Sequence, residues 1–125
     1  MSERGVAMKK ILFKVMKDCV IFKFIQEKYD KADLNDFISF IGKKLEEEKI
    51  TNAVVDFRQV KYRMPVMDVF ELSARVARLW GNKYKVAALT NREFSRFGET
   101  VAKNRGAEVF ISPDFKEIRN WFRKQ

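Results

Sequence analysis

The stretch of this chain with the most chemical potential follows an apolar run near its middle. Residues 53–55 are Ala-Val-Val, and after them come one carboxylate, three basic side chains and one phenol: Asp56, Arg58, Lys61, Tyr62 and Arg63. Two arginines at this spacing could hold a phosphate or a carboxylate through paired hydrogen bonds. Alternatively, Asp56 accepts hydrogen bonds from loop amides or pairs with an arginine, and the basic side chains are solvated. We predict that Asp56 organises this loop and that Arg58 and Arg63 make the contacts with a ligand or partner.

Other familiar chemistries lack the residues they need. The chain has no histidine, which removes Ser-His-Asp and Cys-His catalysis and the usual ligands of transition metals. Cys19 lies in a β-rich run and is expected to be a small apolar core residue. The five glycines form neither a phosphate-binding loop nor a dinucleotide-binding turn. We therefore expect a protein that is not an enzyme, with no catalytic residue, no metal and no cofactor.

The charge balance is strongly basic. The chain has 26 Lys and Arg against 17 Asp and Glu, a net charge of +9, which suits nucleic acid, an anionic membrane surface or an acidic protein as partner. The basic residues are scattered over nearly every segment, which favours the simpler interpretation of many solvated surface lysines.

The single cysteine suits a reducing compartment. The N-terminus carries no apolar signal region, and no apolar run approaches the roughly 18–20 residues of a membrane span. We expect a cytoplasmic location.

Hydrophobic periodicity predicts the elements of one domain over residues 10–125, preceded by a flexible N-terminus over residues 1–9. Runs 10–16 and 19–25 alternate apolar and polar residues and predict an antiparallel hairpin. The outer face of this hairpin is also rather apolar, so it could be partly covered by the N-terminus or could contact a second copy of the chain in a homodimer. Asp33 is the expected N-cap of the helix that follows.

The rest of the chain alternates strands and helices. We predict a central strand over 50–57, a helix from Pro65 to Gly81, a strand over 84–89, a helix from Thr90 to Gly106, a strand over 108–111 and a last helix capped by Ser112. The order β-β-α-β-α-β-α-β-α predicts an α/β domain with a mixed, mostly parallel sheet and about four helices. Because the carboxyl ends of parallel strands meet at one edge, Arg92 and Arg96 are expected near the loop after the central strand.

This order and three stretches of sequence resemble the STAS domain and the SpoIIAA-like proteins grouped with it. The stretches are residues 53–56 with the loop and helix after them, residues 84–93, and residues 105–122, in which an Arg-Gly pair precedes a short strand and a helix ending in Trp-Phe. The resemblance covers residues 10–124. STAS switches carry a phosphorylatable Ser or Thr where the helix after the central strand begins, and residues 62–65 are Tyr-Arg-Met-Pro, without that serine.

The resemblance implies a non-enzymatic binding or regulatory module. We expect it to bind a protein partner or a small anionic ligand through the loop after the central strand and the first half of the next helix. The alternative is binding of nucleic acid through the basic surface.

Overall fold

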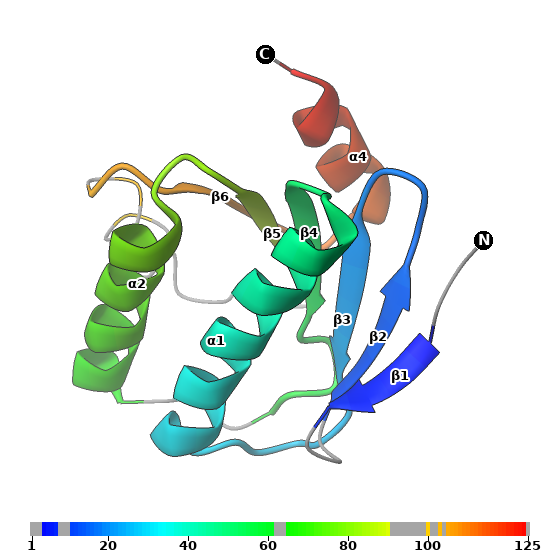
Figure 1. Ribbon diagram of the computed structural model, residues 1–125. Coiled ribbons are helices and arrows are strands. Elements are labelled where there is room, and N and C mark those ends of the chain that lie inside the picture. Colours follow the sequence, from blue (N-terminus) through cyan, green and yellow to red (C-terminus); the bar gives the residue numbers. More distant parts are fainter. Residues whose placement is uncertain are drawn as a thin grey trace.

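The computed structural model (Figure 1) describes residues 4–7, 11–61, 65–90, 100, 103 and 105–124. Four of the predicted site residues lie outside this part of the chain: Tyr62, Arg63, Arg92 and Arg96. The predicted helix between Thr90 and Gly106 also lies almost entirely outside it.

A six-stranded sheet with strands in sequence order forms the centre of the fold. Its strands are β1 (Arg4–Ala7), β2 (Ile11–Val15), β3 (Val20–Phe24), β4 (Asn52–Asp56), β5 (Lys85–Leu89) and β6 (Glu108–Ser112). The β1–β2 and β2–β3 pairs are antiparallel, and the three pairs from β3 to β6 are parallel. The predicted mixed sheet, mostly parallel after the hairpin, is confirmed.

The N-terminus differs from the prediction. We expected residues 1–9 to be flexible, but Arg4–Ala7 form β1 and pair with β2 along the edge of the sheet. The reason is that β2 would otherwise present a row of unpaired amide and carbonyl groups, and a preceding strand in reach satisfies them.

One face of the sheet is covered by two helices, α1 (Lys31–Glu48) and α2 (Val66–Trp80), which lie side by side in Figure 1. Right-handed crossovers that step along the sheet in one direction place their helices on the same face, as happens here for β3–α1–β4 and β4–α2–β5. This face holds the larger core. Phe22 lies between Phe13 and Val55 in the strand register, and all three are buried against the helices.

The first helix begins earlier than predicted. Its N-cap is Asp30 and not Asp33, because the two form a reciprocal capping box. The Asp33 amide donates to Asp30 Oδ1 at 2.8 Å, and the Asp30 amide donates to Asp33 Oδ2 at 3.3 Å. Asp33 therefore serves as the third helical residue of the box.

The opposite face of the sheet carries the C-terminal helix α4 (Phe115–Arg123). Ile118 is fully buried there, in a second core cluster that includes Val54 and Ala87. The N-cap of α4 is Asp114, which accepts the Lys116 amide at 2.8 Å, and not the predicted Ser112. Ser112 is the last residue of β6, and its buried hydroxyl accepts the Asp114 amide and donates to the Glu117 carboxylate.

Cys19 belongs to this second cluster and is buried, as predicted. Burial and the negative charge of Asp18 raise the pKa of the Cys19 thiol to about 11, although the positive charge of Arg119 opposes the shift. The thiol is therefore protonated near neutral pH, which agrees with a core role and not with a nucleophile.

Candidate functional site

The carboxyl ends of the parallel strands are tied together by backbone hydrogen bonds. The Phe57 amide donates to the Leu89 carbonyl at 2.8 Å, which joins the loop after β4 to the end of β5. The Lys61 amide donates to the Glu27 carbonyl at 2.8 Å, which joins the same loop to the loop after β3. The described part of the loop after β4 is thus held on both sides and presents its side chains from a fixed backbone.

Asp56 ends β4 and is buried, with 4% of its surface exposed. Its Oδ1 accepts the Arg58 amide and Arg58 Nε, both at 3.0 Å, and its Oδ2 accepts Arg58 Nη2 at 2.8 Å. The two side chains therefore form a bidentate ion pair that closes a tight loop. Asp56 thus closes the start of the loop, and its role as organiser of a binding site stays a prediction.

The electrostatics of the pair favour the charged form of both groups. Burial alone raises the pKa of Asp56, but hydrogen bonds from Arg58, together with the charges of Arg58 and Lys23, outweigh it and lower the pKa below its usual value. Lys23 lies next to Asp56 in the register between β3 and β4. The hydrogen bond to Asp56 in turn raises the pKa of Arg58, so the pair stays ionised across the physiological range.

Arg58 is bound to Asp56 in this structure, and its predicted contact with a ligand or partner stays a prediction. The Nε and Nη2 groups of a guanidinium can donate two parallel hydrogen bonds to one carboxylate or phosphate. In this structure both groups of Arg58 donate to Asp56. The alternative stated from the sequence, in which Asp56 accepts a loop amide and pairs with an arginine, describes these contacts. A ligand anion would have to displace or share this pair.

Lys61 lies on the rim of the same edge. Its ammonium group is 3.1 Å from the Glu27 carboxylate, and both side chains are largely exposed, at 74% and 69%. Such a pair is weak, so Lys61 can exchange this partner for another at little cost. Placement of Tyr62, Arg63, Arg92 and Arg96 at this rim stays a prediction, because they lie outside the described residues.

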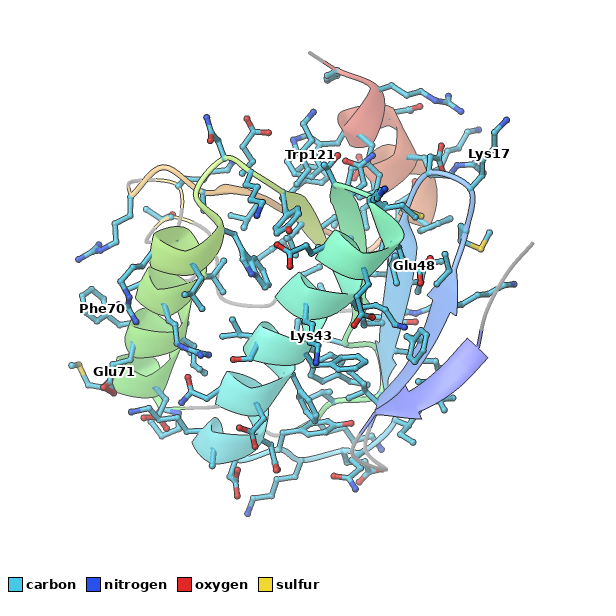
Figure 2. The ribbon with its side chains drawn as sticks, viewed as in Figure 1. Lys17, Lys43, Glu48, Phe70, Glu71 and Trp121 are labelled. Atoms are coloured by element: carbon cyan, nitrogen blue, oxygen red, sulfur yellow. The ribbon has the colours of Figure 1, made fainter. Side chains whose placement is uncertain are left out.

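The structure adds an apolar feature next to this loop that the sequence reading did not select. Met67, in the first turn of α2, is 65% exposed, more than any other large hydrophobic side chain among the described residues. Phe70 follows one turn later, half-buried, and Figure 2 shows its side chain pointing away from α1. The Arg105 guanidinium lies 5.0 Å from the centre of the Phe70 ring.

The sequence carried one signal for this feature. In the helix predicted from Pro65 to Gly81, apolar and small residues recur at helical spacing at positions 66, 69, 70, 73, 76, 77 and 80, and Met67 falls outside this stripe. An apolar side chain off the buried stripe of an amphipathic helix is either incidental or part of a contact surface.

Two wider observations concern the kinds of site present. Within the described ranges, no three His, Cys, Asp or Glu side chains are grouped so that they could hold a metal ion. None of the described helices is long and apolar enough to cross a membrane.

Comparison with known proteins gives the fold. No family model and no curated protein matches this chain. Among solved structures, the chain is similar to the NMR structure of the protein TM1081, with a TM-score of 0.54 and 11% sequence identity over 90% of this chain and 88% of that one. At this identity, the likeness establishes a shared mixed α/β fold.

Proposed function

We propose that the chain is a non-enzymatic STAS/SpoIIAA-like module of the cytoplasm that binds a protein partner. The contact surface consists of the described loop after β4 and the N-terminal half of α2. The order of strands and helices, the resemblance in residues 53–56 and 105–122, and the α/β likeness to TM1081 support the proposal.

The observation that carries the choice of surface is the exposure of Met67. Exposing a large apolar side chain to water is unfavourable by about 25 cal/mol per Å² of apolar surface, and a partner that covers it recovers this free energy. Met67, Phe70 and Ala74 recur at three- and four-residue spacing and so share one face of α2. Methionine and aromatic side chains are enriched at the centres of protein interfaces.

A protein partner fits the observed contacts better than a small anion does. The arginine predicted to hold an anion already holds Asp56, which is buried and ionised. The sheet order β1-β2-β3-β4-β5-β6 does not reverse among the described strands. Ligand crevices in open α/β sheets form where the strand order reverses, since neighbouring loops diverge there.

The experiment is site-specific photo-crosslinking in cells. A photoreactive amino acid replaces Met67 in one variant and Lys43, an exposed residue of α1, in the control. We expect a discrete adduct of one partner protein from position 67 and none from position 43. The identified partner is then titrated calorimetrically with the wild type and with Met67→Glu and Phe70→Ala.

Loss of at least about tenfold in affinity, or about 1.4 kcal/mol, is expected for each variant if these side chains lie in the interface core. Equal adducts from both positions, or unchanged affinity of both variants, would contradict the proposed surface. A small mass that stays bound to the wild type in native mass spectrometry and is lost on Arg58→Ala would favour the small anionic ligand instead.

A further inference from the structure

The cations of this protein are used differently on the two faces of the sheet. On the side of α1 and α2, lysines pair with carboxylates: Lys31 with Glu71, Lys44 with Glu47 and Glu48, and Lys83 with Glu46. Arg75 of α2 donates to the Asn35 carbonyl at 2.7 Å and to Ser39 Oγ at 2.9 Å, which links it to α1. The Lys31–Glu71 pair and the hydrogen bonds of Arg75 link α1 to α2, whereas Lys44 pairs within α1 and Lys83 reaches α1 from the loop after α2.

The outer surface of α4, on the opposite face, is basic. Ile118 points into the core, so residues on the far side of the helix face water. These are Lys116, Arg119, Asn120 and Arg123, at three- and four-residue spacing, and all four are exposed. These four positions hold no carboxylate and no apolar side chain, and the exposed Glu117 flanks them on the same helix, where it accepts a hydrogen bond from Ser112.

The hairpin of β2 and β3 extends this basic surface. Ile21 packs on the same cluster as Ile118, so alternate residues of β3 share the face that carries α4. Lys23 is two residues further along β3, and Lys14 is the register partner of Ile21, so both lysines lie on this face. Lys17 is exposed in the turn between the strands, and Figure 2 shows it on the side of the molecule where α4 lies.

Helix and hairpin are close enough to act together. The positive charge of Arg119 opposes the effects of burial and Asp18 on the pKa of Cys19, which follows the hairpin turn. No ion pair with a described carboxylate joins the six residues that are called the basic face below: Lys14, Lys17, Lys23, Lys116, Arg119 and Arg123. On the side of α1 and α2, Lys31, Lys44 and Lys83 have such pairs, and the exposed Lys43 and Arg78 do not.

We propose that the basic face binds the phosphate backbone of a nucleic acid. Six cations from the β2–β3 hairpin and α4, gathered on one side of a chain of net charge +9, match a linear polyanion in sign and extent. Asn120, in the middle of the stripe, is a side chain that can contact phosphate or a base edge.

The other polyanionic surfaces fit less well. An amphipathic helix that binds a membrane inserts its apolar side, but α4 turns Phe115, Ile118 and Phe122 towards the sheet. The core of a protein interface is rich in aromatic side chains and poor in lysine, whereas the outer surface of α4 has the reverse composition. The nucleic acid backbone requires only cations and hydrogen-bond donors.

The experiment measures affinity by fluorescence anisotropy for duplex DNA, duplex RNA and single-stranded DNA of equal length, at several salt concentrations. If about six phosphates are contacted, the slope of log affinity against log salt is about −5 for a duplex, and affinity falls by about 10³ between 50 and 200 mM salt. The tightest of the three probes identifies the nucleic acid class.

The decisive variant is Arg119→Glu/Arg123→Glu, and the matched control is Lys43→Glu/Arg78→Glu. All four side chains are exposed on helices, and both variants change the net charge by the same amount, but the control residues lie on α1 and α2. We expect the α4 variant to weaken binding at least about tenfold and to reduce the salt slope by about two, with the control close to wild type. Circular dichroism confirms that both variants remain folded.

Three results would overturn the proposal. Equal loss in both double variants would mean that binding follows net charge alone. No saturable binding at 50 mM salt would remove the activity. Tighter binding to polyglutamate, or to vesicles containing an anionic lipid, than to every nucleic acid would assign the basic face to an acidic protein or to a membrane surface. None of these results bears on the crosslinks from Met67, so the two surfaces are tested independently.

Discussion

Replacing Asp56 with asparagine tests the organisation of the loop after β4. The substitution keeps the size of the side chain but removes its charge, and it places an amide that can only donate opposite one of the two Arg58 nitrogens. A hydrogen bond to a charged group contributes about 1.5–3 kcal/mol, and the 52% exposure of Arg58 lets its guanidinium recover part of that from water. We expect the free energy of unfolding to fall by about 2 kcal/mol at pH 7. For a chain of 125 residues this corresponds to a melting temperature lower by about 8 °C.

The pH dependence gives the sharper test. The pKa of Asp56 is lower in the folded protein than in the unfolded chain, so its contribution to stability is present above the unfolded value of about 3.9 and is lost as pH falls through the folded value. Asparagine does not titrate. The difference in unfolding free energy between wild type and Asp56→Asn should therefore be largest at pH 7 and should shrink on acidification below about pH 4.

The assay is urea unfolding followed by tryptophan fluorescence at pH 7, 5 and 3. Glu27→Gln is the control, because Glu27 lies at the same edge but in an exposed pair with Lys61, and its effect should stay within about 0.5 kcal/mol. A difference between wild type and Asp56→Asn that is the same at pH 7 and pH 3 would refute the assignment of this stability to the ionised pair.

Three further predictions concern the two cores. In Gly42→Ala, the new methyl group would lie 2.8 Å from Nε1 of the buried Trp80. The cost of overpacking, about 1–3 kcal/mol, should exceed the gain in helix propensity of about 1 kcal/mol, so the variant should be less stable than wild type. A variant that is more stable than wild type in urea would contradict the close approach of α1 and Trp80. Burial and Asp18 raise the pKa of the Cys19 thiol to about 11, against the opposing charge of Arg119. At pH 8 only about one thiol in a thousand is then ionised, so a disulfide reagent should label the native protein far more slowly than protein in denaturant. Ile118→Ala should lower the unfolding free energy by about 2–5 kcal/mol in the same urea assay, since Ile118 is fully buried beneath α4, whereas a loss below about 1 kcal/mol would mean that α4 is only loosely docked.

The patterns that predicted the elements are those in which one local force dominates. Alternation in β2 and β3 places Phe13 and Phe22 on one face whatever the rest of the chain does, and the structure shows the two in register. Errors occurred where two neighbouring residues compete for one task. Asp30 and Asp33 can each be the N-cap of a helix. The spacing of the apolar residues did not distinguish a helix with N-cap Asp33 from one in which Asp30 is the N-cap and both residues form a capping box.

For Asp56 and Arg58 the sequence offered two alternatives and could not choose between them. The strands from β3 to β6 are parallel, so the polar residues at the end of β4 lie at the same edge of the sheet as the residues that follow the neighbouring strands. Arg58 binds Asp56 because of the path that the loop takes. Hydrogen bonds from the loop to the Leu89 and Glu27 carbonyls, in other parts of the chain, hold that path in place.

The sequence by itself therefore determined the kinds and order of the described elements from β2 onward, because periodicity, caps and the handedness of crossovers act over a few residues or follow a general rule; it did not predict β1. It also determined the buried character of Cys19 and the absence of histidine chemistry. Only the tertiary structure decided which charges are neighbours. Lys14 and Arg119 are far apart along the chain, and their shared face arises because strand register and the docking of Ile118 turn them to the same side. Basic residues that are scattered along the sequence are gathered on one face by folding. Local sequence patterns span only a few residues, so they cannot show that residues this far apart along the chain are neighbours.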